Sequence, residues 1–256
     1  MRFASLGSGS RGNGTLIETD GTCLLVDCGF SIAETERRLA RLKRRPEDID
    51  AILITHEHAD HVRGVARFAA RFNIPVRATA GTLAACGRYQ VESAEPFNAH
   101  EGFAIGGLEI TPIAVPHDAR EPTQFLFSDG ARRLGLLTDA GHITAHITRT
   151  LSVCDALILE CNHDEAMLIG GPYPPRLKQR VGGLLGHLSN AQAAGLLGGL
   201  DLSHLQHLVA AHLSEHNNTP EHARAALAEA VGCETDWIAV ADQEEGLDWR
   251  ELLPAI

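Results

Sequence analysis

The segment THEHADH at residues 55–61 places three histidines and two carboxylates side by side. His56, His58, Asp60 and His61 directly follow the apolar run AILI, which is typical of a strand buried on both faces. In a turn after such a strand, His56 and His58 can face one cation while Asp60 and His61 reach a second. Imidazole and carboxylate ligands suit zinc and are compatible with iron or manganese. We therefore predict a metal site, rather than a histidine-rich solvated loop.

Other apolar runs also end in side chains of metal-binding or acid–base type. These are Asp27 after LLV, His117 after IAVP, Asp139 after LLT, Glu160 after LIL and His212 after VAA. Strand ends in α/β sheets are where sites assemble, because the scaffold is rigid and the loops are open. Taken singly, His117 is typical of a loop or core histidine and Asp139 of a helix cap. Beside the 55–61 segment, we favour a functional role for both.

The elements that must position these residues alternate between strands and helices. Early hairpins over residues 1–27 precede a helix at 33–45, and the buried run 51–55 precedes a helix at 60–72. Further strands are expected at 76–80, 102–116, 123–128, 133–138, 156–160, 207–211 and 237–241, and helices at 81–87, 142–151, 174–184, 190–198 and 220–231. No linker or low-complexity tract divides the chain, so we expect one α/β domain over residues 1–256, with packed sheets covered by helices.

The composition is that of an ordinary globular protein, with 44% hydrophobic and 21% charged residues. No apolar run is long enough to cross a bilayer and the N-terminus lacks a signal-peptide core, so we expect a cytoplasmic protein without membrane contact. The six cysteines form no CxxC pair, and we expect them reduced and mostly buried. A net charge of −11 argues against broad, non-specific nucleic-acid binding but allows a local basic groove.

The glycine-rich segment GSGSRGNG at 7–14 matches the GxGxxG spacing of dinucleotide-binding loops. The segment TLIET that follows alternates like a strand, whereas that fold needs a helix there, so we reject a dinucleotide site. A glycine/serine turn is the favoured interpretation. The functional alternative is an anion nest built from the backbone amides with Ser8, Ser10 and Asn13.

The motif HxHxDH at 56–61 resembles the signature of the metallo-β-lactamase superfamily, and the resemblance covers essentially the whole chain. It implies a four-layer αββα sandwich with a dinuclear site at one edge of the sheets. By position in the sequence, the ligands of the first metal correspond to His56, His58 and His117, and those of the second correspond to Asp60, His61 and His212. The carboxylate that bridges both metals corresponds to Asp139, and the acid that orients the motif corresponds to Asp27.

The segment 160–218 resembles one branch of this superfamily. Asp139 disfavours a true β-lactamase, which leaves thioester and lactone hydrolases or phosphodiesterases and nucleases. The runs ECNHDEAML, GPYPPRLKQRVGGLLGHLSN and HLSEHNN resemble the YycJ/WalJ-like branch, which is tied to DNA exonuclease activity. The short interval from Asp139 to His187 leaves no room for the large inserted domain of related nucleases, and the long arm of RNase Z is also lacking.

This branch implies a nuclease in which a metal-bridging hydroxide attacks the phosphodiester. It implies a catalytic role for Asp60, as a metal ligand, and proton donation by His187, which is paired with Glu160. The roles of His187 and His212 are open to exchange, and an ordinary helix cap is the alternative for His187. We expect DNA as substrate, degraded from the 5′ end. A small-molecule hydrolase of thioesters, lactones or cyclic phosphodiesters is the second hypothesis, and a non-enzymatic metal-bound module is disfavoured. The oligomeric state is left open.

Further polar residues are candidates for substrate contact. They are Ser8, Ser10, Asn13, His163, Ser189, Asn190, Asn217 and Asn218. Arg176, Lys178 and Arg180 are candidates for a local basic groove, although a solvated helix face is the favoured interpretation. We expect the remaining well-separated histidines to be surface or helix residues, namely His100, His142, His146, His204, His207 and His222.

Overall fold

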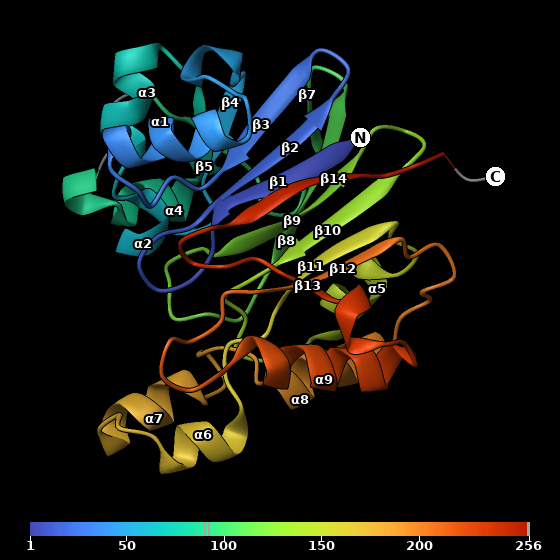
Figure 1. The fold of residues 1–256 in the computed structure, drawn as a ribbon. Coiled ribbons are helices and arrows are strands. Elements are labelled where there is room, and N and C mark those ends of the chain that lie inside the picture. The colour runs from blue at the N-terminus through green and yellow to red at the C-terminus, as the bar shows by residue number, and fades with distance from the viewer. Residues whose placement is uncertain (90, 92, 255–256) are drawn as a thin grey trace.

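The computed structural model describes residues 1–89, 91 and 93–254, and its strands form two seven-stranded sheets that face each other (Figure 1). The first sheet has the order β14-β1-β2-β3-β4-β5-β6, and the second has the order β13-β12-β11-β10-β9-β8-β7. The strands of the first sheet are β1 (Arg2–Gly7), β2 (Gly14–Thr19), β3 (Thr22–Val26), β4 (Ala51–Leu53), β5 (Val76–Thr79), β6 (Glu95–Phe97) and β14 (Leu247–Glu251). Those of the second are β7 (Phe103–Ile105), β8 (Leu108–Ala114), β9 (Thr123–Ser128), β10 (Arg133–Leu137), β11 (Ala156–Glu160), β12 (His207–Ala211) and β13 (Ala239–Val240).

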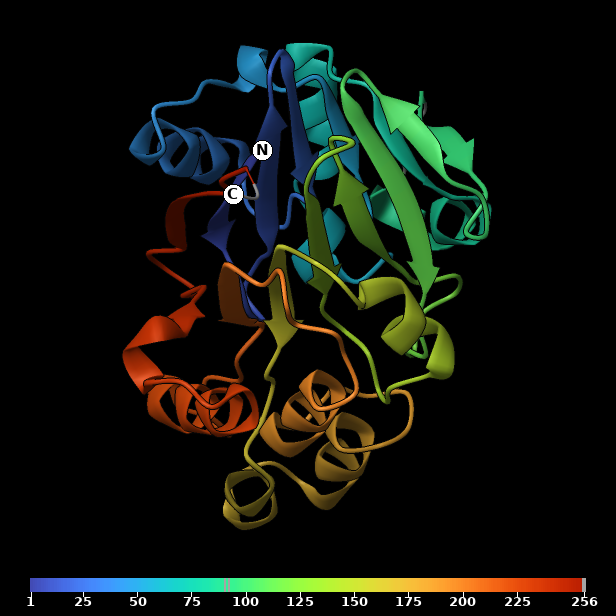
Figure 2. The same cartoon turned by 90° about the vertical axis from the view of Figure 1, so that its right-hand side faces the viewer.

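Helices cover the outer face of each sheet, which confirms the expected αββα sandwich. The helices are α1 (Ile32–Arg41), α2 (Ala59–Val62), α3 (Val65–Phe72), α4 (Ala80–Ala85), α5 (Ala145–Leu151), α6 (Glu165–Gly170), α7 (Pro175–Val181), α8 (Asn190–Leu197) and α9 (Pro220–Val231). Leu39 of α1 and Phe68 of α3 pack in one cluster with the first sheet, and Leu196 of α8 and Leu227 of α9 pack with the second. In the turned view, α6 and α7 lie beyond α8 at the periphery (Figure 2).

The central strands are apolar on both sides because each side meets a different part of the core. In β3, Leu24 and Val26 belong to the cluster between the sheets, whereas Leu25 belongs to the cluster under α1 and α3. In β11, Ile158 faces the other sheet and Leu157 faces the helices. This period-two alternation explains why these strands appear in the sequence as continuous apolar runs.

The parallel pairings of both sheets bring the predicted functional residues to one end of the sandwich. β3 runs parallel to β4, and β10, β11 and β12 run parallel to one another. Parallel strands end at the same edge of their sheet, so the segments that follow β3, β4, β10, β11 and β12 all emerge there. These segments begin with or contain Asp27, the 55–61 motif, Asp139, Glu160 and His212.

Several element predictions were wrong in detail. The helix expected at 60–72 is broken into α2 and α3 at Gly64, whose amide donates to the carbonyl of Cys28 at 2.9 Å. The buried strand expected at 51–55 ends at Leu53, and the helix expected from 142 begins only at Ala145, after the capping Thr144.

Three elements were not anticipated: α6, β6 and β14. β14 has the sequence LDWRE, of which only the leucine is buried, so it carries little apolar pattern even though it pairs with β1. All six cysteines are free and five are buried, as expected. Among the described residues, every helix is too short or too polar to span a bilayer.

Candidate metal centre

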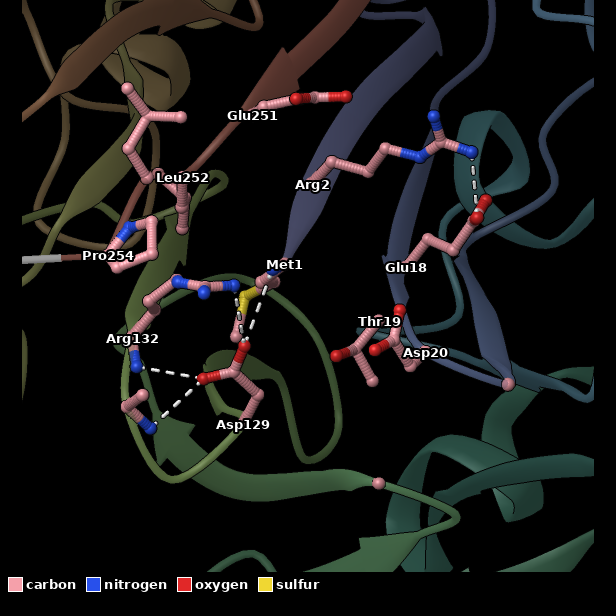
Figure 3. A pocket seen from close by; sticks show the side chains of 14 residues that line it. Met1, Arg2, Glu18, Thr19, Asp20, Asp129, Arg132, Glu251, Leu252 and Pro254 are labelled. Carbon is pink, nitrogen blue, oxygen red and sulfur yellow. Dashed lines mark hydrogen bonds and ion pairs between the residues drawn. The ribbon is translucent and has the colours of Figure 1, made fainter.

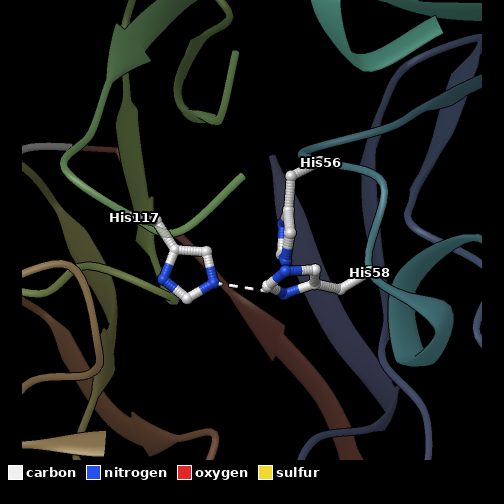
Figure 4. Close-up of side chains that lie close together, drawn as sticks. All are labelled: His56, His58 and His117. Carbon is white, nitrogen blue, oxygen red and sulfur yellow. Dashed lines mark hydrogen bonds between the residues drawn. The ribbon is translucent and has the colours of Figure 1, made fainter. Parts of the chain in front are cut away.

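Three histidines from two segments converge at the end of the sandwich (Figure 4). His56 and His58 follow β4, and His117 follows β8 on the opposite sheet. One ring nitrogen of each lies within 4.8 Å of the others, and His117 Nε2 is 3.3 Å from His58 Nδ1. Three nitrogen donors this close together can hold one cation.

A second group of donors lies beside the first. Asp60, His61 and His212 form a cluster with the same spacing, with His61 Nε2 3.4 Å from Asp60 Oδ2. Asp139 adjoins both groups: its Oδ2 is 3.3 Å from His61 Nε2, and it also forms a cluster with His56 and His61. The fold therefore brings together all seven residues that the sequence suggested as metal ligands.

Several of these atoms are buried without a hydrogen-bond partner among the described residues. They are His56 Nε2, Asp139 Oδ2 and both ring nitrogens of His212. A buried polar atom without a partner is costly, and coordination of a cation would satisfy each of these. The donor set fits two divalent cations, one beside His56, His58 and His117, the other beside Asp60, His61 and His212, with Asp139 between them.

Contacts behind the ligands fix their orientation. Asp27 Oδ2 accepts a hydrogen bond from His61 Nδ1 at 2.7 Å, which leaves Nε2 for the site. The hydroxyl of Thr55 donates to Asp27 Oδ2 at 2.8 Å and lies 2.9 Å from His56 Nδ1. His117 Nδ1 donates to the carbonyl of Gly186 at 2.9 Å. Such outer contacts set the ring orientation and the tautomer of ligating histidines. Thr55 was not singled out from the sequence, and its only signal is its place directly before His56.

Three site residues adopt the left-handed backbone conformation. Asp27, Asp139 and His212 have φ values of 61°, 52° and 55°. This conformation is uncommon outside glycine, although Asp and His tolerate it better than most residues. Each of them lies where its strand ends, and the turn aims its side chain into the cluster. Backbone strain of this kind concentrates at functional sites.

Glu160 and His187 form a hydrogen-bonded pair at the edge of the cluster. Glu160 Oε1 accepts from His187 Nδ1 at 2.8 Å, and Glu160 Oε2 accepts the amides of Ala140 and Leu188 at 2.9 and 3.1 Å. The Glu160 side chain is fully buried, whereas that of His187 is 20% exposed. His187 Nδ1 also lies 3.4 Å from Asp139 Oδ1. The pair therefore contacts Asp139 directly and reaches solvent through its imidazole.

The buried charges bias the protonation of these rings. Burial, reinforced by the neighbouring His61 and His117, holds the pKa of His56 well below its ordinary value, so this ring is neutral and able to bind a cation. Burial alone would lower the pKa of His187, but the carboxylates of Glu160 and Asp139 outweigh it and raise that pKa. Burial likewise opposes the charge on Glu160, yet His187 lowers the pKa of this carboxyl. Both shifts favour the charged forms of the two side chains.

The glycine-rich loop supports the site from the first sheet. The amide of Gly9 donates to Asn13 Oδ1 at 2.8 Å, and the amide of Asn13 donates to the carbonyl of Asp60, also at 2.8 Å. Asn13 Nδ2 lies 3.2 Å from Asp60 Oδ2. Ser8 Oγ accepts the amide of His212 at 2.9 Å, whereas Ser10 is exposed. The loop amides of Ser8, Gly9, Arg11, Gly12 and Asn13 all donate within the protein. These bonds match the turn interpretation and leave those amides without capacity for an anion nest.

Five other candidates for substrate contact lie in the interior. His163, Ser189, Asn190, Asn217 and Asn218 are between 0% and 6% exposed. Asn190 and Asn218 exchange two side-chain hydrogen bonds of 2.8 and 2.9 Å, and Ser189 caps α8. These residues join the 160–164 and 212–219 segments to the start of α8, and the structure does not place them on an exposed surface of the site.

The remaining candidates lie around the site. In the exposed helix α7, Arg180 Nε donates to Asp118 Oδ2 at 2.6 Å and Lys178 donates to the carbonyl of Ile169. α7 is thus the solvated face that the sequence favoured. The metal-binding clusters found among the described residues include none of His100, His142, His146, His204, His207 and His222.

A large cavity of about 820 Å³ lies at the other end of the sandwich (Figure 3). It is lined by the β2–β3 and β9–β10 turns and by residues near both chain ends, and several of its charged groups form ion pairs. Asp129 binds the N-terminal amine at 3.4 Å and Arg132 at 3.3 Å, and Arg2 binds Glu18 at 2.8 Å. Its lining holds no histidine and lies at the end of the sandwich opposite the ligand clusters, so this cavity is not the candidate active site.

A family model described as the beta-lactamase superfamily domain matches residues 22–213, a segment that contains every ligand candidate. The chain belongs to the metallo-β-lactamase superfamily. Its curated relatives include exodeoxyribonuclease YycJ of Bacillus anthracis, 33% identical over 90% of this chain and 89% of that protein. Exodeoxyribonuclease WalJ of Streptococcus pneumoniae is 33% identical over 98% of this chain and 93% of that protein.

Solved structures of this superfamily share the fold over its whole length. The metallo-β-lactamase fold protein YhfI from Bacillus subtilis superimposes with a TM-score of 0.75 and 17% identity, covering 98% of this chain and 99% of that one. With the family and the two adjoining ligand clusters established, the protein is a metal-dependent hydrolase whose His/Asp clusters are typical of a dinuclear site.

Proposed function

We propose that this metallo-β-lactamase superfamily member is a phosphodiesterase that degrades DNA from the 5′ end with two bound zinc or manganese ions, iron being compatible with the same ligands. The observation that carries the proposal is the contact of the buried Glu160–His187 pair with Asp139. The two relatives named exodeoxyribonucleases, which match along nearly the whole chain, support DNA as the substrate.

The ligand set assigns places to the two ions. His56, His58 and His117 would hold one, Asp60, His61 and His212 the other, and Asp139 both. When bound, such a pair of cations polarises the phosphoryl group and supplies a nucleophile from water at neutral pH. Asn13 and Asp27 keep Asp60 and His61 in place, through contacts of 3.2 and 2.7 Å respectively.

The Glu160–His187 pair supplies what phosphodiester cleavage still needs. The leaving group of DNA hydrolysis is an alkoxide, which requires a proton. Glu160 accepts from Nδ1 of His187 and so orients the ring and favours its cationic form, which leaves the proton on Nε2 for the leaving oxygen. General-acid catalysis of this kind contributes about 10²–10⁴-fold in rate. A thioester has a good leaving group and gains little from such a pair, so the geometry favours a phosphodiesterase over a thioester hydrolase.

A substrate panel tests this function. The metal-loaded protein is offered single- and double-stranded DNA and RNA labelled at either end, bis-p-nitrophenyl phosphate, and a thioester. We expect hydrolysis of DNA with early release of the 5′ label as a mononucleotide. Hydrolysis of the thioester alone would contradict the proposal, and early release of the 3′ label would overturn the polarity.

A further inference from the structure

A groove of about 680 Å³ lies beside the metal centre, on the side of the first sheet. It runs between the glycine-rich loop, the start of α1 and the junction of α2 with α3. Its lining includes four arginines, namely Arg11, Arg38, Arg63 and Arg67, and two carboxylates, Glu34 and Glu244. In a chain with a net charge of −11, this local excess of positive charge requires an explanation.

The carboxylates of the groove are occupied by two of these arginines. Arg38 is only 4% exposed and forms ion pairs with Glu34 and with Glu244. Its Nη2 lies 3.3 Å from Glu244 Oε2. Arg11 pairs with Glu244 at 2.7 Å and with Glu215 at 2.6 Å. These ion pairs hold the walls of the groove together and neutralise each other.

Arg63 and Arg67 keep their charge. The guanidinium of Arg63 donates to the carbonyl oxygens of Gly29 and Arg11, which carry no formal charge. Arg67 of α3 is also exposed, and within the described part of the chain neither arginine has a carboxylate within ion-pair distance. Two adjacent, unneutralised guanidinium groups are a typical binding site for successive phosphates.

The groove is rigidly joined to the metal centre. Arg63 lies two positions after the ligand candidate His61. Gly29 contacts both sides: its carbonyl accepts from Arg63, and its amide donates to the carbonyl of Asn13 at 2.9 Å. Asn13 in turn donates to the carbonyl of Asp60 at 2.8 Å. A Cβ atom at Gly29 would lie 1.7 Å from that Asp60 carbonyl, so the backbones are in direct contact. The walls of the groove and the turn that carries Asp60 and His61 therefore form one packed unit.

We propose that Arg63 and Arg67 bind the phosphate backbone of the DNA strand whose end lies in the metal centre, an inference that rests on the proposed function. The contact is with the backbone and not with the bases, because the aromatic ring of the groove, Phe30, is only 5% exposed and lies 4.2 Å beneath the Arg38 guanidinium. The lining residues include no exposed aromatic ring on which a base could stack. Binding in the groove should therefore depend on the length and charge of the strand and not on its base sequence.

Binding of a nuclease-resistant phosphorothioate strand to the metal-loaded protein tests this proposal. Fluorescence anisotropy is measured against salt concentration for the wild type, Arg63→Ala/Arg67→Ala and Arg63→Lys/Arg67→Lys. Arg71→Ala is the matched control, because Arg71 lies on the same helix but 4.0 Å from Glu36. Each lost phosphate contact lowers the slope of log K against log salt by about 0.7 on single strands.

We expect the double alanine variant to lose about 1.4 of that slope and about tenfold in affinity for long strands, while the lysine variant keeps most of both and Arg71→Ala matches the wild type. For the double alanine variant, the loss of kcat/KM on long DNA should exceed the loss on bis-p-nitrophenyl phosphate about tenfold. If the wild type cleaves DNA but the double alanine variant keeps the wild-type slope of log K against log salt, the proposed groove contact is overturned and the proposed function is not. A wild type that neither binds nor cleaves DNA would overturn both the groove and the proposed function.

Discussion

Glu160 Oε1 and His187 Nδ1 are 2.8 Å apart, and the other oxygen of Glu160 accepts the amide of Leu188, the residue that follows His187. One fully buried carboxylate thus holds both the ring of the proposed proton donor and its backbone. This arrangement fixes the ring in three dimensions at the edge of the ligand cluster and makes the two residues a single functional unit.

The first prediction follows from that unit. His187→Ala and Glu160→Gln should each lower DNA turnover by about 10²–10⁴-fold, because the first removes the proton donor and the second its orienting charge. The double variant should lose little more than either single variant, since residues that act together are strongly non-additive. His100→Ala, a change at an exposed histidine outside the clusters, is the control. Losses that multiply in the double variant would show that the two residues act separately.

The second prediction concerns Thr55, which touches both Asp27 and His56. Thr55→Val keeps the volume but removes the hydroxyl that fixes the His56 ring, and we expect a 10–100-fold lower metal affinity by competition with a chelator. Thr35→Val is the matched control, because the Thr35 hydroxyl is equally buried but donates to the Ser31 carbonyl at 3.0 Å. Equal metal affinities of the two variants would remove the orienting role of Thr55.

The third prediction concerns Gly29, where the first sheet meets the metal-binding turn. A Cβ atom there would lie 1.7 Å from the carbonyl oxygen of Asp60, and neither backbone can yield without moving the Asp60 ligand. Gly29→Ala should therefore lose bound metal and activity together. Gly170→Ala, with no atom within 4 Å of the added carbon, should match the wild type in metal content. Full metal content in Gly29→Ala would show that the contact does not control the site.

The fourth prediction concerns metal removal. Four ligand candidates lie together at residues 56–61, but His117, Asp139 and His212 join them only in the folded chain, so cations should bind the native state more tightly than the unfolded chain. At a free metal concentration about 1,000-fold above Kd, this contributes about 4 kcal/mol to the free energy of unfolding. For a chain of this size, chelation should lower Tm by about 10 °C, and zinc or manganese should restore it. A Tm indifferent to chelator would argue against tightly bound ions.

Much of the site could be predicted from the sequence because the ligands are local or follow strong apolar runs. The HxHxDH motif occupies residues 56–61, and Asp139, Glu160 and His212 each stand where a buried strand ends. Parallel pairing then places these ends at one edge, so the strand pattern alone predicts their proximity. The same pattern correctly predicted packed sheets covered by helices, and the family resemblance correctly implied the four-layer αββα sandwich.

The residues that depend on tertiary contacts could not be predicted in the same way. Nothing near Thr55 in the sequence shows that its hydroxyl meets Asp27, and the break between α2 and α3 coincides with a hydrogen bond from Gly64 to the distant Cys28. The polar side chains of His163, Asn190 and Asn218 are typical of substrate contacts by residue type, yet long-range packing buries them. The polar strand β14 forms only because β1 offers it a free edge.

The most direct test of the central claim compares two leaving groups at equal metal content. Turnover by the wild type and by His187→Ala is measured on DNA, whose alkoxide leaving group needs a proton, and on bis-p-nitrophenyl phosphate, whose leaving group does not. We predict a loss of about 10²–10⁴-fold on DNA and a far smaller loss on the nitrophenyl ester. Equal losses on both substrates, or undiminished cleavage of DNA, would contradict proton delivery by His187.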